Sequence, residues 1–341
     1  MESLAWMSEE RDGKVLCKAC YQRCLVKDGE YGKCGVRVNR EGKLFLTVYG
    51  SVASYNTDPI EKKPLYHFLP GTYTFSVGTV GCNFSCLFCQ NWEISQYPQT
   101  HRYKTFGENM SPEDIVRLAK VYKTPSISYT YNEPVIFFEF AFDTMKLAHA
   151  EGIRNVFVTS GYETEEVIDA SLPYLSAMNI DLKSFSDKFY REVCGARLKP
   201  VLKTIEYAYK KGVWIEITTL VIPGLNDTSE EIRDIARFIR SISENIPWHI
   251  SRFFPAYKMT NLSPTPLSSL IGAYEIAKEE GLNYVYLGNY PSEDLESTYC
   301  PSCAYKVIER KGFLGEQVKV HLSDGKCPKC GKVIDGIWSL F

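Results

Sequence analysis

Residues 81–91 read Gly-Cys-Asn-Phe-Ser-Cys-Leu-Phe-Cys-Gln-Asn and carry Cys82, Cys86 and Cys89 with three and then two residues between them. A β-rich run at 73–79 comes just before, so we expect this stretch to be a loop at the end of a strand. Three thiolates at this spacing can hold one face of a [4Fe–4S] cube and leave one iron without a protein ligand. A zinc knuckle with a borrowed fourth ligand, or a set of buried thiols, is the alternative, although structural zinc favours paired hooks.

Short β-rich runs alternate with segments of helical period between about residues 72 and 290. Each gap between runs is long enough for a crossover helix, so the pattern predicts parallel strands joined by helices. The candidate strands are residues 73–79, 126–130, 155–159, 177–182, 214–221, 249–254 and 284–287.

Unusual polar motifs follow these strands one after another, at 81–91, 131–134, 159–162, 181–184 and 223–227. A doubly wound sheet would also fit the alternation of strands and helices. Polar motifs gathered at strand ends favour a barrel, where chemistry collects at the carboxyl ends of the strands.

The fold class that we predict is α/β, with a partial (β/α)6-type TIM barrel over residues 71–292. A Cys-rich module and lead-in should occupy residues 1–70. A zinc-ribbon-like module should occupy residues 293–341.

The overall composition excludes several classes of function. The chain has 341 residues, 45% of them hydrophobic, and a net charge of −2 from 39 basic and 41 acidic residues. With so little net charge, the protein as a whole has no electric field that would attract a polyanion or an anionic membrane. Binding of nucleic acid is therefore not indicated. The sequence shows no signal-peptide pattern at its start and no apolar run of membrane-spanning length. We expect a cytoplasmic location and no membrane partner.

Two further cysteine sets flank the central motif. Cys300, Cys303, Cys327 and Cys330 form two C-x2-C knuckles, which indicate a closed structural zinc site, with rubredoxin-type iron as the alternative. Cys17, Cys20, Cys24 and Cys34 mix their spacings, and either zinc or an auxiliary Fe–S cluster would satisfy them. We favour zinc at this N-terminal set, because the Gly, Lys and Asp residues around it suggest a loop module without the apolar shelter that a cluster prefers.

The central motif, with the aromatic Phe88 before its last cysteine, resembles the signature of the radical S-adenosylmethionine (SAM) superfamily. The resemblance covers most of residues 70–260. Within that superfamily the chain looks closest to the radical SAM enzyme of the AmmeMemoRadiSam system, a relative of the pyruvate formate-lyase activating enzymes. Three segments are similar to motifs of those activases: residues 89–91, 181–183 and 221–224.

The resemblance implies a SAM pocket at the mouth of the barrel. Glu133, in Tyr131-Asn132-Glu133-Pro134, stands where the family has a turn that binds the methionine amino group, and Pro134 should keep it extended. Ser160 is expected to contact the SAM carboxylate or ribose. Ile222 and Gly224 are expected beside the adenine, because glycine lets the backbone approach closely. A surface glutamate, a strand-end hydroxyl and plain turn residues are the alternative interpretations.

Two side chains are expected to lie closer to the chemistry. Asp181 and Lys183 share one face of a strand end. The resemblance implies that Asp181 helps to hold a monovalent cation near the bound SAM and that Lys183 is a basic group of the catalytic site, and a plain ion pair is the alternative. Cys194 is a candidate for relaying a hydrogen atom or a radical, or for supplying an extra ligand, although a lone cysteine is most often inert packing.

Taken together, the motifs predict a radical SAM enzyme with an unidentified substrate, which by analogy with the activases is a protein or peptide. Its cofactors would be a [4Fe–4S] cluster and SAM. Its partners would be an electron donor such as ferredoxin or flavodoxin, and the other proteins of the AmmeMemoRadiSam system. The alternatives are a noncatalytic, metal-stabilised module that binds RNA or protein, and an assembly subunit.

Overall fold

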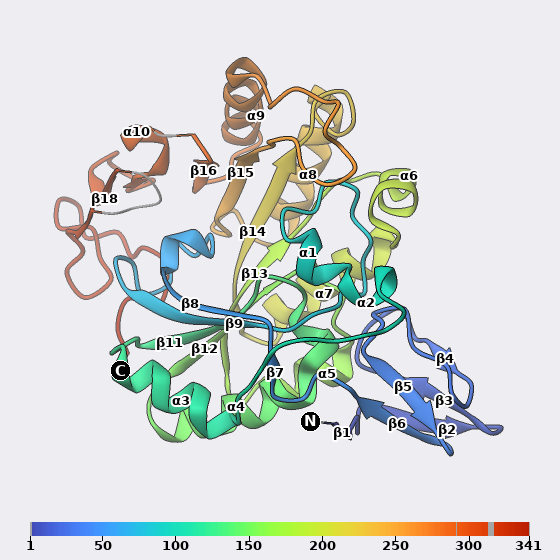
Figure 1. Cartoon of the computed structure of the whole chain (residues 1–341). Helices are drawn as coiled ribbons and strands as arrows, with labels where there is room; N and C mark the ends of the chain where they lie inside the picture. The colour runs from blue at the N-terminus through green and yellow to red at the C-terminus, as the bar shows by residue number, and fades with distance from the viewer. Residues whose placement is uncertain (1, 291, 313–316, 341) are drawn as a thin grey trace.

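The computed structural model describes residues 2–290, 292–312 and 317–340. Its largest element is an eight-stranded sheet with the order β16-β15-β14-β13-β12-β11-β9-β8 (Figure 1). The strands are β8 (Ser54–Pro59), β9 (Tyr73–Gly78), β11 (Ser126–Tyr129), β12 (Arg154–Thr159), β13 (Leu175–Asp181), β14 (Trp214–Val221), β15 (Trp248–Arg252) and β16 (Val285–Gly288). Within the described residues the end strands β8 and β16 do not pair, so the barrel is open.

All seven predicted strands are present, and they pair in parallel as expected. The eighth strand, β8, pairs antiparallel with β9 and lies in the segment that we assigned to the N-terminal lead-in. The α/β fold class is therefore confirmed. The three domain boundaries stay a prediction.

Helices connect the parallel strands. The longer ones are α3 (Pro112–Val121), α4 (Phe138–Ala150), α5 (Glu165–Ser171), α7 (Leu198–Lys210), α8 (Ser229–Ile242) and α9 (Leu267–Glu279). The shorter ones are α1 (Trp92–Ser95), α2 (Tyr97–Thr100), α6 (Asp187–Phe189), α10 (Glu293–Glu296), the 3-10 turns η1 (Ile60–Lys62) and η2 (Pro134–Phe137), and the π-turn η3 (Tyr190–Cys194). None of the helices in the described ranges is long and apolar enough to cross a membrane.

Two helix starts show how local sequence sets these elements. Ser111 and Asp114 form a reciprocal capping box at the start of α3. Thr228 caps α8 through the backbone N–H of Glu231. The Glu231 carboxylate does not complete a second box. It accepts hydrogen bonds from Ser184 Oγ and Phe185 N, and so fixes the loop that follows β13.

Small antiparallel sheets flank the barrel at opposite sides of the molecule (Figure 1). The N-terminal part holds β1 (Ser3–Leu4), β2 (Ser8–Arg11), β3 (Lys14–Cys17), β4 (Leu25–Val26), β5 (Arg37–Arg40), β6 (Lys43–Leu46) and β7 (Ser51–Val52), the last of which pairs with β10 (Glu108–Asn109). The C-terminal part holds β17 (Thr298–Tyr299), β18 (Lys306–Lys311) and β19 (Gln317–Val320).

The C-terminal part docks near the amino end of β14, away from the strand ends that carry the polar motifs. Glu216, near the start of β14, accepts hydrogen bonds from the backbone N–H groups of Tyr66 and His67. His67 in turn contacts Asp335, and the buried Arg310 donates to the carbonyl of Tyr66. This end of the barrel is thus filled by buried side chains, which leaves the carboxyl ends of the strands as the open face.

Candidate active site at the carboxyl ends of the strands

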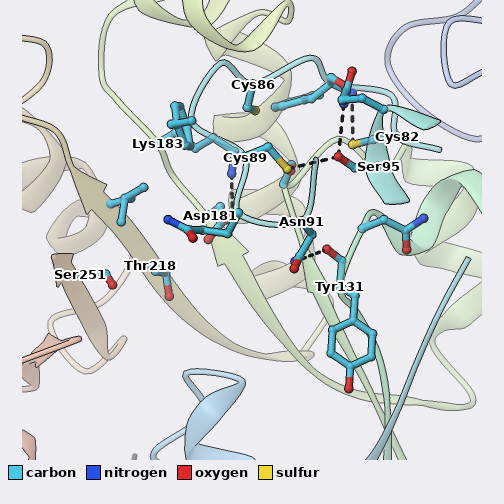
Figure 2. Close-up of a pocket in the computed structure, with 17 residues that line it drawn as sticks. Cys82, Cys86, Cys89, Asn91, Ser95, Tyr131, Asp181, Lys183, Thr218 and Ser251 are labelled. Atoms are coloured by element: carbon cyan, nitrogen blue, oxygen red, sulfur yellow. Dashed lines mark hydrogen bonds and ion pairs between the residues drawn. The ribbon is translucent and has the colours of Figure 1, made fainter. Parts of the chain in front are cut away.

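A cavity opens at the carboxyl ends of the parallel strands, and three cysteines form part of its wall (Figure 2). The loop after β9 contributes Cys82, Cys86 and Cys89. The next strand ends contribute the remaining polar groups. The full lining is Cys82, Phe84, Cys86, Phe88, Cys89, Gln90, Asn91, Ser95, Gln96, Tyr131, Asn132, Ser160, Asp181, Lys183, Thr218, Leu220 and Ser251.

The cysteine loop is held by backbone and side-chain hydrogen bonds from several elements. The N–H groups of Ser85 and Leu87 donate to the carbonyls of Cys194 and Val193, at 2.9 and 3.0 Å. The Gln96 side chain donates to the carbonyl of Phe84 at 3.1 Å. These bonds fix the loop without using the cysteine sulfurs, which stay free for a ligand.

The three sulfurs have few partners of their own. Cys82 and Cys86 are buried, Cys89 is partly exposed, and none is in a disulfide. The Cys82 Sγ accepts from the N–H of Phe84 at 3.4 Å, and the Cys89 Sγ lies 3.2 Å from Ser95 Oγ. Amide and hydroxyl donors to sulfur are typical of iron–sulfur sites. The described residues therefore fit a cluster bound by three cysteines.

Asp181 and Lys183 face the cysteines from the end of β13. The Lys183 Nζ lies 2.6 Å from Asp181 Oδ2 and 5.7 Å from the centre of the Phe88 ring. Burial alone would lower the pKa of Lys183, but the Asp181 carboxylate and the Cys86 thiol raise it well above the usual value. A permanent cation thus stands beside the cysteine loop.

Glu133 is buried behind the cavity wall rather than in it. Its carboxylate accepts from Thr159 Oγ1 and from the N–H of Ser160, both at 2.9 Å. Ser160 does line the cavity. The Glu133 carboxylate is therefore connected to the cavity wall through its hydrogen bond with the backbone of Ser160. Its predicted contact with the SAM ammonium stays a prediction.

Glu163 is a second buried carboxyl group, which our sequence reasoning missed. Its two oxygens have no hydrogen-bond partner among the described residues. Burial and then repulsion from Glu133 raise the pKa of Glu163 to about 8. Burial and a like-charged neighbour thus favour the protonated form of the Glu163 carboxyl at neutral pH. Its position two residues after Thr159-Ser160-Gly161, at a strand end, was the available sequence signal.

The remaining predicted residues, Ile222, Gly224 and Cys194, do not line the cavity. Ile222 is fully buried and its N–H donates to Asn226 Oδ1 at 2.6 Å. The N–H of Gly224 donates to Asp227 Oδ1 at 2.8 Å, and its φ of 74° suits glycine. Cys194 is fully buried, and its thiol adjoins that of Cys86. The roles that we predicted for these three residues stay predictions.

Ser95 and Gln96, at the end of α1, line the cavity and escaped sequence reasoning, as did three residues of predicted strands: Thr218, Leu220 and Ser251. Thr218 and Leu220 alternate along β14 and therefore point to one face of the sheet. Ser251 lies near the end of β15. Their place at the ends of predicted strands was the usable signal, but no distinctive residue type marked them.

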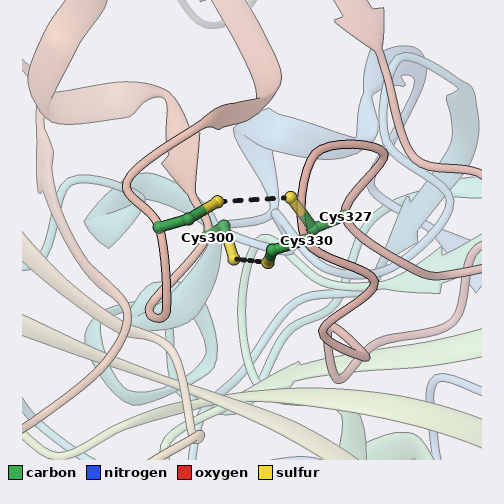
Figure 3. A group of neighbouring side chains, drawn as sticks. Cys300, Cys327 and Cys330 are labelled. Carbon is green, nitrogen blue, oxygen red and sulfur yellow. Dashed lines mark hydrogen bonds between the residues drawn. The ribbon is translucent and has the colours of Figure 1, made fainter.

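The two terminal cysteine sets are each gathered in space. The C-terminal four have all their sulfurs within 4.8 Å of one another, with Cys300–Cys330 at 3.5 Å and Cys303–Cys327 at 3.6 Å (Figure 3). Such spacing fits one tetrahedral metal ion, because zinc–sulfur bonds of about 2.3 Å place the sulfurs about 3.8 Å apart. The N-terminal four, Cys17, Cys20, Cys24 and Cys34, line a small cavity of their own.

The geometry agrees with comparisons to known proteins. A model of the radical SAM superfamily matches residues 76–239. An uncharacterized protein of Methanocaldococcus jannaschii is 45% identical over 326 residues, which is 95% of this chain and 96% of that protein. The pyruvate formate-lyase-activating enzyme of Clostridium pasteurianum is 24% identical over 183 residues, which is 50% of this chain and 72% of that enzyme.

A solved structure shows the same fold. SuiB of Streptococcus suis, bound to S-adenosylmethionine, superposes with a TM-score of 0.50 at 15% identity, over 67% of this chain and 53% of SuiB. The open parallel barrel and the cysteine trio at its mouth define the class of iron–sulfur barrel proteins. Within that class, the chain belongs to the radical SAM superfamily. The narrower resemblance to the AmmeMemoRadiSam enzyme stays a prediction.

Proposed function

We propose that this chain reductively cleaves SAM and uses the resulting radical to take a hydrogen atom from a protein or peptide. The observation that carries the proposal is the shared cavity, which is lined by three thiols outside any disulfide together with Ser160, Asp181 and Lys183. Cys82, Cys86 and Cys89 would hold a [4Fe–4S] cluster with one open iron. When bound, such a cluster supplies one electron to SAM, which yields methionine and a 5′-deoxyadenosyl radical.

The polar residues of the chain would bind and orient SAM. The Lys183 ammonium, held by Asp181, offers a fixed positive charge to the methionine carboxylate. The Ser160 hydroxyl offers a hydrogen bond beside it, and its backbone is fixed by Glu133. Cys194 adjoins Cys86 and would help to position that thiol, which is the role that we propose for it.

Apolar side chains would keep water away from the radical. Phe84 and Phe88 are buried in the cavity wall, and Leu220 of β14 also lines the cavity. Excluding water strengthens the charge interactions inside the site, and a packed wall holds the substrate beside the place where the radical forms.

Exposed aromatic residues beside the cavity support a macromolecular substrate. Trp92 follows the lining residue Asn91 and stacks on Tyr257 with ring centroids 5.2 Å apart. Phe254 is 42% exposed, and its carbonyl accepts from the lining residue Gln90. Aromatic groups held at a surface are typical of binding patches for proteins. The activating enzymes among the relatives support the same choice.

The proposal also includes partners and a location. Cleavage of SAM requires one electron at low potential, so we propose a carrier protein such as ferredoxin or flavodoxin as the donor. A reducing compartment keeps cysteines from forming disulfides and so leaves their thiols available to bind metal. The free thiols of this chain therefore support a cytoplasmic location. For the C-terminal four cysteines we propose structural zinc.

The test is release of 5′-deoxyadenosine. The full chain is reconstituted anaerobically with iron and sulfide, reduced with dithionite, and supplied with SAM. We expect product from the wild type and none from Cys86→Ala. Ser85→Ala, an exposed neighbour that does not line the cavity, is the matched control and should keep the activity. A fully loaded wild type that releases no product, or a Cys86→Ala variant that still does, would overturn the proposal.

A further inference from the structure

The N-terminal cysteines lie around a cavity that the proposed reaction does not use. Cys17 ends β3, Cys20 and Cys24 follow in the next turn, and Cys34 comes just before β5. All four line the same small cavity, and each is a free thiol. The fold thus brings the four thiols to one cavity without any disulfide bond between them.

The spacing of these four thiols differs from that of the C-terminal set. The C-terminal sulfurs form a compact group that suits one metal ion, whereas the described N-terminal residues form no group of that compactness. The central trio, Cys82, Cys86 and Cys89, shares the open arrangement. A cube of four irons holds its cysteines at its outer corners, so it requires sulfurs farther apart than a single zinc ion does.

Apolar and buried surroundings also favour a cluster. Ala19, Val135 and Ile136 contribute to the cavity wall, and Cys17, Cys20 and Cys34 are buried. The sequence suggested a loop module without apolar shelter, and that was our reason to favour zinc. The turn η2 supplies the shelter from far along the chain, which a reading of local composition could not detect.

A buried donor lies at the same cavity. Asn83 is 1% exposed and lines the cavity, where its side chain lies beside the Cys20 thiol, and its Nδ2 makes no hydrogen bond of regular geometry among the described residues. The Arg37 guanidinium, 2% exposed, also lines it and pairs with Glu139. An N–H donor and a fixed cation suit the sulfide and thiolate sulfurs of a negatively charged cluster.

From these observations we infer that Cys17, Cys20, Cys24 and Cys34 hold a second [4Fe–4S] cluster, fully ligated by protein. Asn83 would lie between the central cluster and the N-terminal cluster. Its Oδ1 lies 3.8 Å from the Cys82 Sγ, and Asn83 also lines the N-terminal cavity. Adjacent residues of one loop therefore border both cavities. Two reduced clusters this close should interact magnetically.

The test counts and identifies the metals in the full chain, purified without oxygen. We expect the wild type to hold about eight irons and the triple variant Cys82→Ala/Cys86→Ala/Cys89→Ala to keep about four, with matching sulfide. Mössbauer spectra of the triple variant should show a [4Fe–4S] cluster, and SAM should leave its reduced EPR spectrum unchanged, since no iron is open. This readout does not depend on SAM cleavage, so it stands apart from the proposed function.

A reciprocal variant protects the test against misfolding of the triple variant. Cys24→Ser changes the one partly exposed ligand, and we expect it to lose about four irons while the SAM-sensitive EPR signal of the central site remains. In the wild type, a broadened spectrum that sharpens in Cys24→Ser would show the magnetic interaction. One zinc, or no metal, at the N-terminal site of the folded wild type or of the folded triple variant would overturn the inference.

Discussion

Lys183 Nζ and Asp181 Oδ2 lie 2.6 Å apart at the carboxyl end of β13, and both side chains line the cysteine cavity. The pair connects the strand end to the cysteine loop, because the Lys183 cation also lies over the Phe88 ring. The Asp181 carboxylate thus holds the Lys183 ammonium at the cavity, where a bound ligand would meet its positive charge.

The first prediction concerns this pair. Asp181→Asn leaves the Lys183 cation without its counter-charge, so we expect SAM to bind at least about tenfold more weakly, since hydrogen bonds to charged groups contribute about 1.5–3 kcal/mol. Equilibrium binding of SAM to the reconstituted protein measures the effect, and the iron content should not change. Glu192→Gln removes an exposed carboxylate outside the cavity and serves as the control. Equal SAM affinity in Asp181→Asn and the control would contradict the proposed role.

The second prediction concerns the C-terminal metal. Cys330→Ser should lose about one zinc per chain, and the temperature of unfolding should fall by about 5–10 °C, because the metal joins both knuckles of the module. Native mass spectrometry and calorimetry measure the two effects. Lys329→Ser changes an exposed residue of the same knuckle and should keep the zinc. Full zinc content in Cys330→Ser would show that the four sulfurs do not act as one site.

Much of the barrel could be predicted from the sequence, because local signals set it. Apolar runs marked all seven parallel strands, and Ser111 and Thr228 marked two helix starts. The cysteine spacing marked the site, and Asp181 and Lys183 were predicted to share a face. Each of these features depends on residues near one another in the chain.

What the sequence did not reveal depends on distant contacts. Strand β8 carries Asn56, Thr57 and Asp58 where a strand pattern would be apolar, and only its pairing with β9 makes it a strand. Thr218 is an ordinary residue type that the fold places in the cavity wall, and Glu163 is one that the fold buries close to Glu133. Long-range packing likewise sets the shelter of the N-terminal cysteines, which local composition had suggested to be absent.

The third prediction concerns a buried ion pair between the N-terminal part and α4. The Arg37 guanidinium contacts both Glu139 oxygens, at 3.0 and 2.6 Å, and both side chains are at most 2% exposed. Arg37→Met leaves the buried Glu139 carboxylate without its counter-charge. We therefore expect the free energy of unfolding, measured with urea, to fall by about 3–5 kcal/mol. The double variant Arg37→Met/Glu139→Leu should recover most of that loss, because no unpaired charge remains. A single variant that costs under about 1 kcal/mol would argue against a desolvated pair.

The fourth prediction concerns pH and the docking of the C-terminal part. The His67 ring is fully buried, with Nδ1 2.7 Å from the carbonyl of Asp335 and Nε2 2.6 Å from the hydroxyl of Tyr286. Nδ1 therefore donates to the carbonyl, and Nε2 of the neutral ring accepts from the tyrosine. Burial lowers the pKa of His67 to about 4, whereas the pKa of an ordinary histidine is about 6.5.

Between these two pKa values the unfolded chain binds a proton that the native protein does not bind. The contribution of His67 to stability is thus complete above pH 6.5 and is lost as the pH falls toward 4. From pH 7.5 to 5.5 we expect the free energy of unfolding of the wild type to fall by about 1 kcal/mol more than that of His67→Gln, which cannot titrate. Urea unfolding of both metal-loaded proteins at the two pH values measures this difference, and the comparison removes the pH dependence that the metal sites add to both. Equal pH dependence in the two proteins would mean that His67 is not held neutral in the native state.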